Sequence, residues 1–485
     1  MNLPLTLTSS YAIAILYVIN ILLAFTIIFL ERRNPISTLA WILVLFVLPG
    51  IGAFLYFMLS QNLTRKKMFQ LGAEENLIHT SLINKEIADI RSGEMALNDA
   101  SLDNYKDMIL MHLTQSKAYY SQDNAVCIYT DGRKKFEELF LAFSEAKNHI
   151  HVQYFIIKRD SLGKQLIKIL TKKALEGVEV RLLIDALGNQ LRQTDLEPLL
   201  AAGGKVKIFF PSYLSYINLR LNYRNHRKLA IIDGKIGFIG GFNIGNEYIG
   251  LKAKMGYWRD THLKITGSAV LSIQSRFLLD WKAASGDKIR YSEKYYPPPS
   301  IKGSCGIQIV SSGPDSPYEE IKQGYIKMIH AARKSIVIQT PYFVPDASIQ
   351  EALKIAAISG VDVKIMIPNK PDHMFVYWAT YSFVGDLLGA GVKVYIYNRG
   401  FLHSKTIVVD EKIASVGTAN FDIRSFKLNF EVNAFLYDVN ISQILHQAFV
   451  DDMLSSEELT LEKYMKRSIL IKFKESISRL MAPVL

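Results

Sequence analysis

The chain has 485 residues, enough for two or three domains with a large buried core, and 49% of the residues are hydrophobic. It carries 57 Lys and Arg against 45 Asp and Glu. The net charge of +12 indicates a negatively charged partner, for which nucleic acid and an anionic membrane surface both fit. Two cysteines, Cys127 and Cys305, exclude a disulfide framework and a cysteine-rich metal cluster.

Two uncharged apolar runs stand near the start of the chain, at residues 11–30 and 39–60. Each is long enough to cross a hydrocarbon core of about 30 Å as a helix. A cleaved signal peptide is the alternative for the first run, but no basic segment precedes it and a second run follows closely. We therefore expect two transmembrane helices within residues 1–60 and a multi-pass protein of the cell membrane. Basic residues between and after the runs nearly balance, so the side that the remaining chain faces stays open.

Residues 61–120 are polar and mixed in charge, and we expect them to form a connector. The rest of the chain contains an internal repeat. Three pairs of segments match between its halves: 146–155 with 332–343, 177–184 with 360–367, and 204–208 with 391–395. Most join a helical end or a glycine to a short β-branched run, which is typical of α/β units with buried strands. The sequence therefore predicts two homologous α/β lobes, at 121–296 and 297–460, with the prolines at 297–299 between them.

Three other segments have compositions suited to lipid. Residues 210–223 are rich in Tyr, Leu and Ile, which fits a membrane interface or a buried loop equally well. The aromatic stretch 372–388 fits an acyl-chain groove or ordinary core packing. Residues 461–481 alternate basic and apolar side chains, so we expect the terminal region 461–485 to form a basic amphipathic helix on anionic lipid.

One motif occurs once in each half with every spacing preserved. It spells H-x-K-x4-D-x6-G-[GT]-x-N, and its chemistry-bearing positions are His226, Lys228, Asp233 and Asn243 in the first copy and His403, Lys405, Asp410 and Asn420 in the second. Two copies inside a repeat are unlike a chance match to a short pattern. A chain that places a histidine and a lysine twice in one framework is expected to build one site with two histidines.

These residue types suit the transfer of a phosphodiester. A neutral histidine can attack phosphorus to give a phosphohistidine, while a second histidine on the opposite side protonates the leaving oxygen and later deprotonates the incoming hydroxyl. The lysines and asparagines of the motif would hold the non-bridging oxygens and stabilise the charge of the transition state. No carboxylate cluster suggests a metal site, so we expect neither a metal nor another cofactor, with the two lysines in its place.

Other residues support the site. Each histidine needs a partner for its second ring nitrogen, and Asp260 and Glu431, which follow the two motifs at similar distances, are the candidates. Asp233 and Asp410 end their strands, where hydrogen bonds to backbone or lysine would fix the turn. The motif glycines, Gly240, Gly241 and Gly417, would let the backbone approach the substrate closely. Four histidines lack a partner motif and are expected to be structural: His149, His151, His262 and His446.

The duplicated motif resembles that of the phospholipase D superfamily. The two N-terminal runs, the two motifs, the segments 240–248 and 257–262 and the C-terminal 478–485 together resemble the bacterial cardiolipin synthases over essentially the whole chain. This resemblance implies two lobes that share one active site. It also implies transfer of a phosphatidyl group from one phosphatidylglycerol to another, with release of glycerol and without metal or nucleotide. The motif residues, both aspartates included, would be the active-site residues, with His226 as nucleophile and His403 as acid and base.

Three other functions are alternatives to synthesis, and two of them would use the same motifs. Hydrolysis by a phospholipase D differs only in that water accepts the phosphatidyl group. A membrane-anchored phosphodiesterase or nuclease would use the basic surface for nucleic acid, and a lipid-binding protein would leave the motifs idle. The apolar runs and the full-length resemblance rank synthesis first, and no nucleic-acid motif is recognisable. The expected partners are therefore phosphatidylglycerol and cardiolipin in an anionic membrane, not nucleic acid, and the oligomeric state stays open.

Overall fold

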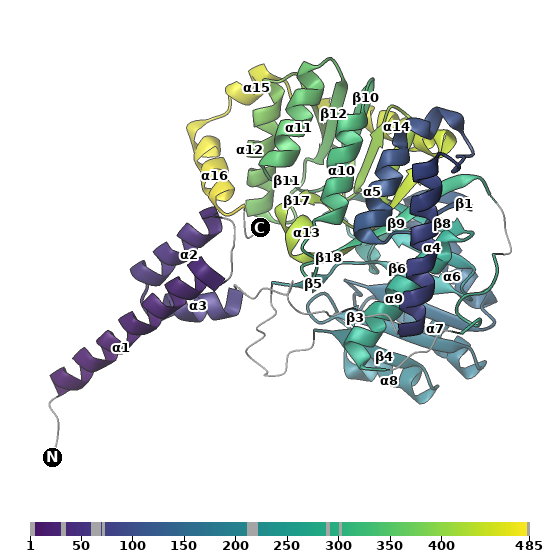
Figure 1. The fold of residues 1–485 in the computed structure, drawn as a ribbon, viewed down its shortest axis with the longest axis horizontal. Helices are drawn as coiled ribbons and strands as arrows, with labels where there is room; N and C mark the ends of the chain where they lie inside the picture. Colours follow the sequence, from purple (N-terminus) through teal and green to yellow (C-terminus); the bar gives the residue numbers. More distant parts are fainter. Residues whose placement is uncertain are drawn as a thin grey trace. The chain divides into compact units, whose positions relative to one another are not determined.

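The computed structural model describes residues 5–30, 35–59, 69, 73–210, 222–287, 292–299 and 303–482. The chain divides into two compact units (Figure 1). The first unit comprises Met1–Arg65 and Pro211–Tyr223, and the second comprises Lys66–Phe210 and Arg224–Leu485. Most of the segment 210–223, which suits a membrane interface or a buried loop, lies outside the described residues.

The described residues of the N-terminal part of the first unit are mostly helical. Its elements are α1 (Leu5–Phe25), a π-helical turn η1 (Thr26–Leu30), α2 (Pro35–Val47) and α3 (Ile51–Leu59). The second apolar run is therefore two short helices, because Pro49 and Gly50, the latter at a φ of 82°, form a turn within it. Among the described residues, no helix combines the length and apolarity needed to cross a membrane. The expectation of two spanning helices is not confirmed.

The second unit holds the repeat as two lobes. The strands of the first lobe are β1 (Tyr120–Asp131), β2 (His149–Tyr154), β3 (Glu179–Asp185), β4 (Lys205–Phe209), β5 (Arg224–Asn225), β6 (Leu229–Ile232), β7 (Ile236–Gly240) and β8 (Tyr257–Thr266). Those of the second are β9 (Cys305–Ser312), β10 (Ser335–Gln339), β11 (Phe343–Val344), β12 (Asp362–Pro368), β13 (Lys393–Tyr397), β14 (Gly400–Leu402), β15 (Thr406–Val409), β16 (Ile413–Gly417), β17 (Phe421–Asp422), β18 (Asn429–Tyr437) and β19 (Ser456–Glu458).

The two sheets have the same order. In the first lobe β4, β3 and β2 are parallel, and β6, β7, β8 and β1 follow antiparallel. In the second lobe β13, β12 and β10 are parallel, and β15, β16, β18 and β9 follow antiparallel. Pairing of β1 with β9 joins the sheets at their matching edges. The predicted α/β fold with two homologous lobes is confirmed.

Helices cover both faces of each sheet. In the first lobe these are α6 (Gly132–Glu145), α7 (Ser161–Leu175), α8 (Gln193–Ala201), a 3-10 turn η3 (Asn246–Ile249) and α9 (Ala269–Ser285). Alternate residues of β2 face opposite ways, so Ile150 and Val152 join the core formed with α6 and α7, whereas His149 and Gln153 contact α9. The second lobe repeats this layering with α10 (Glu320–Ala331), α11 (Ala347–Ile358), α12 (Met374–Leu388), α13 (Ile423–Lys427) and α14 (Val439–Met453).

Residues 61–120 do more than connect. They include α4 (Ala73–Ser92), a 3-10 turn η2 (Ala100–Tyr105) and α5 (Lys106–Ser116). Met108, Ile109 and Leu113 of α5 are buried in one core with Ile321 and Tyr325 of α10. This part of the chain therefore belongs to the core of the second lobe, which its polar composition concealed because only one face of α5 is apolar.

The chain ends in two short helices, α15 (Leu461–Met465) and α16 (Ile469–Leu480), where one amphipathic helix was expected. Helix α16 packs against α12, and the two lie side by side in Figure 1. The aromatic stretch 372–388 fitted either an acyl-chain groove or ordinary core packing. Most of α12 packs in the core, since Ala379, Val384 and Leu387 are buried in the core of the second lobe.

Candidate active site

The histidines of the two motifs lie where the lobes interlock. Short strand β5, just before His226, pairs with the start of β18 in the other lobe, and His226 N–H donates to the carbonyl of Phe430 at 2.9 Å. Strand β14, just before His403, pairs in the same way with the start of β8, and His403 N–H donates to the carbonyl of Arg259 at 2.7 Å. The backbone on both sides of the site is therefore held by the opposite lobe.

The carboxylates that orient the histidines also cross between lobes. Nδ1 of His226 lies 2.9 Å from Oε1 of Glu431, and Nδ1 of His403 lies 2.6 Å from Oδ2 of Asp260. Both carboxylates were the candidates from sequence, but each contacts the histidine of the other motif rather than its own. The repeat thus produces two equivalent histidine–carboxylate pairs, and in each pair the histidine and the carboxylate come from different lobes.

Burial sets the protonation of these groups. The two histidines are 8% and 7% exposed, and burial lowers the pKa of His226 to about 4, against the opposing effect of Glu431. Burial also lowers the pKa of His403. Burial acts to raise the pKa of Asp260 and Glu431, but the neighbouring lysines and histidines outweigh it and leave both values below the usual range. An ionised carboxylate only accepts, so Nδ1 carries the proton and Nε2 keeps its lone pair.

The two motif lysines are fully buried within the same site. Nζ of Lys228 donates to the carbonyl of His226, and Nζ of Lys405 donates to the carbonyl of His403. Burial lowers the pKa of Lys228 to about 7 and that of Lys405 to about 8. Each lysine also lowers the pKa of the other motif's histidine, so the four groups form one electrostatic unit. A phosphodiester anion among them would favour the charged form of both lysines.

Asp233 and Asp410 lie elsewhere. They follow β6 and β15, at the opposite end of each strand from the histidine, seven residues or on the order of 20 Å of extended chain away. Both have a positive φ, 55° and 53°. Each carboxylate accepts three backbone N–H groups, those of Lys147, Asn148 and His149 for Asp233 and those of Arg333, Lys334 and Ser335 for Asp410. Their place among the reacting groups is therefore corrected: they hold the turn and the start of the neighbouring strand.

The two motif asparagines are buried but differ in their contacts. Oδ1 of Asn243 accepts the backbone N–H of Ile156 at 3.1 Å. Nδ2 of Asn420 donates to Asp422 at 3.1 Å, and its Oδ1 has no hydrogen-bond partner among the described residues. Both amides therefore already hold neighbouring chain, and only part of each is left for a substrate.

The motif glycines make room for protein groups. A Cβ on Gly241 would lie 1.9 Å from Oδ1 of Asp260, and one on Gly417 would lie 2.1 Å from Oδ1 of Asn433. Gly240 has a φ of 155° and its Cβ would meet the backbone of His262. The expectation that these glycines admit the substrate is therefore replaced by a packing role, since Gly241 clears the space that the orienting carboxylate Asp260 occupies.

An arginine that the sequence analysis did not identify donates to the backbone carbonyl of each orienting residue, Glu431 and Asp260. Nε of Arg227 donates to the carbonyl of Glu431 at 3.1 Å, and its Nη1 donates to both oxygens of Asp280 at 2.7 and 2.8 Å. Nη1 of Arg259 donates to the carbonyl of Asp260 at 2.7 Å, and its Nε donates to Asp452 at 2.7 Å.

A glutamine completes each of these networks. Nε2 of Gln153 donates to Asp280 at 2.6 Å, and Nε2 of Gln339 donates to Asp452 at 2.8 Å. The glutamines occupy equivalent places in the matched segments 146–155 and 332–343, which is the signal that could have revealed them. The aspartates belong to α9 and α14, the helix after the last long strand of each lobe.

The four histidines that were expected to be structural have different surroundings. Gln274 contacts His149 at 3.2 Å and His151 at 2.9 Å, His446 lies 3.7 Å from Glu411, and His262 is fully buried. Within the part of the chain that the structure describes, no three His, Cys, Asp or Glu side chains are placed to hold a metal ion.

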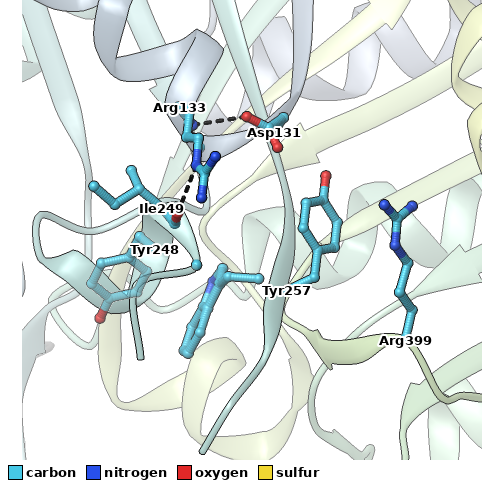
Figure 2. Close-up of a pocket in the computed structure, with 9 residues that line it drawn as sticks. Asp131, Arg133, Tyr248, Ile249, Tyr257 and Arg399 are labelled. Carbon is cyan, nitrogen blue, oxygen red and sulfur yellow. Dashed lines mark hydrogen bonds between the residues drawn. The ribbon is translucent and has the colours of Figure 1, made fainter. Parts of the chain in front are cut away.

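A polar cavity of about 360 Å³ lies beside Trp258, which also borders the site because its ring lies 5.2 Å from that of His403. Figure 2 shows Arg133, Tyr257 and Arg399 around this cavity, with Nε of Arg133 donating to the carbonyl of Ile249 at 3.1 Å. The guanidinium of Arg399 lies 4.6 Å from the ring of Tyr257. Trp258 thus lines this cavity, together with Asp131, Arg133 and Arg399, and also contacts one histidine of the site.

Known proteins share both the fold and the motifs. The family model described as "Cardiolipin synthase, PLD-like domain" matches residues 139–268 and 325–453, and one described as "Phospholipase_D-nuclease N-terminal" matches residues 18–61. The chain is 52% identical to the major cardiolipin synthase ClsA of Bacillus subtilis, over 98% of this chain and 99% of that protein. It is 51% identical to a cardiolipin synthase of Oceanobacillus iheyensis, over 98% and 99%.

A solved structure shares the fold of most of the chain. It is the phosphatidylserine synthase of Haemophilus influenzae, with a TM-score of 0.58 and 14% identity, over 77% of this chain and 99% of that one. At this identity the likeness concerns the fold alone.

Proposed function

The chain belongs to the cardiolipin synthases of the phospholipase D superfamily and is a phosphatidyltransferase that forms cardiolipin, and from this premise we propose how its two motifs carry out the transfer. One phosphatidylglycerol gives its phosphatidyl group to a hydroxyl of a second, and glycerol leaves. The observation that carries the proposal is the pair of neutral histidines, each held through Nδ1 by an ionised carboxylate from the other lobe.

In the first step, Nε2 of His226 attacks phosphorus. A P–N bond forms while the P–O bond to glycerol breaks, and His403 gives its Nε2 proton to the glycerol oxygen. His403 must hold that proton when substrate is bound, and the negative phosphodiester favours it because an opposite charge raises the pKa of a neighbouring histidine.

In the second step, the hydroxyl of another phosphatidylglycerol gives its proton to His403 and its oxygen attacks phosphorus. A P–O bond forms, the P–N bond breaks, and His226 regains its lone pair. Lys228 and Lys405 bind the non-bridging oxygens in both steps, where buried cations stabilise the charge of the transition state strongly. Asn243 and Asn420 support the same oxygens with the part of their amides that is left, whereas Asp233 and Asp410 contribute only to the turn.

Membrane attachment is part of the proposal. The uncharged runs fall within residues 11–60, and the N-terminal family model matches residues 18–61. A chain whose substrates and product are phospholipids gains from such an anchor, and its net charge of +12 suits an anionic surface. We assign residues 1–60 to the cell membrane and propose that they cross it twice.

A product assay tests the function. Purified protein is mixed with phosphatidylglycerol in detergent micelles, and lipids and free glycerol are followed by mass spectrometry. Equal amounts of cardiolipin and glycerol are expected from the wild type, and none from His226→Ala or His403→Ala. His446→Ala is the control, because this histidine lies outside the site. Phosphatidic acid without cardiolipin would mean that water accepts the phosphatidyl group and would overturn the transferase assignment.

A further inference from the structure

Helix α16 is turned with its apolar side away from the protein. Five of its six large apolar side chains are exposed by 41% to 86%: Ile469, Leu470, Phe473, Ile477 and Leu480. At about 100° per residue, they share a stripe about 100° wide. Glu475 and Ser478 lie on the opposite side and are only 2% and 1% exposed. Apart from the partly buried Ile471, the helix therefore buries polar groups and exposes apolar ones, which is the reverse of a solvated surface helix.

Specific contacts hold this orientation. Nε of Arg467 donates to both oxygens of Glu475 at 3.0 and 2.8 Å. Nη2 of Arg479 donates to Asp386 at 2.6 Å, and its Nη1 donates to Oγ of Ser382 at 3.1 Å, both on α12. Turning the apolar stripe inward would bring Glu475 to the surface and break its buried ion pair, a costly change. The exposed stripe is therefore a built feature of the second lobe.

The charges beside the stripe indicate what covers it. Lys472 and Lys474 lie about 60° and 40° beyond its two edges. Lys472 makes no ion pair with any described residue, and Lys474 lies over the ring of Trp378 at 5.3 Å. A lysine at each edge can reach phosphate groups while its aliphatic stem stays with the apolar face. A second copy of this chain would bring the same lysines and the same net positive charge, so it fits the stripe poorly.

We propose that α16 docks the second unit on an anionic phospholipid bilayer, with the apolar stripe in the acyl boundary and the two lysines among the headgroups. This docking rests on the proposed function, since the lipid substrates of that function lie in the same bilayer. It is separate from the N-terminal anchor, which acts through other residues.

A fluorescent probe on the full-length protein tests the docking. Cys127 is exposed and Cys305 is buried, so Cys127→Ser gives a background for labelling. An environment-sensitive dye is placed on Phe473→Cys, and the matched control is Leu454→Cys, an apolar position that is 88% exposed outside α16. In vesicles of phosphatidylglycerol with brominated acyl chains, the dye at 473 should be quenched and the dye at 454 should not. Equal quenching of the dye at positions 473 and 454 would overturn the proposal.

An activity comparison adds an independent result. Leu470→Gln/Phe473→Gln should lower the rate on phosphatidylglycerol vesicles about tenfold or more, because apolar burial of two large side chains is lost. Its rate in detergent micelles should stay near that of the wild type. Equal rates on vesicles, or loss of a dimer in solution without any quenching at 473, would reject the bilayer as partner. If the wild type formed no cardiolipin in vesicles and none in micelles, the proposed function would be rejected instead. The quenching at position 473 would still test the docking.

Discussion

His226 and His403 each depend on a carboxylate that the other lobe supplies. Because Glu431 and Asp260 are fully buried and ionised, each fixes the tautomer of its histidine and stabilises the positive charge that forms on it. Neither lobe alone contains a complete histidine–carboxylate pair. The chemistry therefore needs both lobes even if a single histidine is the nucleophile.

Replacing either carboxylate by its amide should remove activity without unfolding the protein. In Glu431→Gln and Asp260→Asn the amide can present N–H to the histidine and so favour the wrong tautomer, and we expect kcat to fall about 100-fold or more. Steady-state cardiolipin synthesis in micelles and circular dichroism are the measurements. A variant with kcat within about twofold of the wild type would mean that its carboxylate does not orient the histidine.

The pH dependence of kcat/KM follows from the two histidines and the two lysines. His226 attacks only when neutral, so activity should be lost as the pH falls through about 4, the pKa of His226. His403 protonates the leaving oxygen only in its charged form, and burial lowers its pKa, so activity should first decline as the pH rises through the pKa of His403. Lys228 and Lys405 bind phosphate only when protonated, so the decline should steepen as the pH rises through about 7 to 8. Lys228→Arg should move the high-pH limb upward, because the guanidinium stays charged. An unchanged high-pH limb in this variant would contradict the assignment of that limb to Lys228.

The motif histidines and aspartates lie at the ends of strands rather than in their middles. Strands β5 and β14 end at the histidines and pair across the lobes, while the turns after β6 and β15 are closed by Asp233 and Asp410. One motif thus contains two functions at opposite ends of a strand. In the sequence, the histidine, the lysine and the aspartate belong to one motif. In the structure, the strand after the lysine places the aspartate far from the reacting groups.

Asp233→Asn and Asp410→Asn test this separation. Each change weakens three backbone hydrogen bonds to a carboxylate, so the free energy of unfolding should fall by about 1–3 kcal/mol. The folded fraction should keep most of its activity, whereas His226→Ala should keep its stability and lose its activity. Thermal unfolding and the rate per folded molecule are measured together. An inactive Asp233→Asn protein of full stability would return the aspartate to the reacting groups.

Over the whole molecule, the internal repeat was the most informative part of the sequence. It predicted two α/β lobes, and the matched order of the two sheets and the family model that matches once in each half confirm them. It also pointed to Asp260 and Glu431. It could not show that each of them contacts the histidine of the other motif, because distance along the chain does not reveal which lobe a side chain faces. The arginines Arg227 and Arg259 were missed for the same reason, since their partners lie far away in sequence.

Amphipathic segments were harder to predict. The break at Pro49 divides an apolar run that hydropathy alone treats as continuous, and α5 joins the core of the second lobe although its segment is polar on average. The basic C-terminal helix was expected, but only its packing against α12 shows that the apolar face points outward.

Trapping the covalent intermediate tests the central claim most directly. Full-length protein is mixed with phosphatidylglycerol, quenched within milliseconds in alkali, digested and mapped by mass spectrometry, with His226→Ala and His446→Ala treated alike. The two-histidine account predicts a phosphatidyl adduct on Nε2 of His226 in the wild type and in His446→Ala, and none on His226→Ala. Full turnover by His226→Ala, or cardiolipin formed with no adduct on either motif histidine, would contradict it.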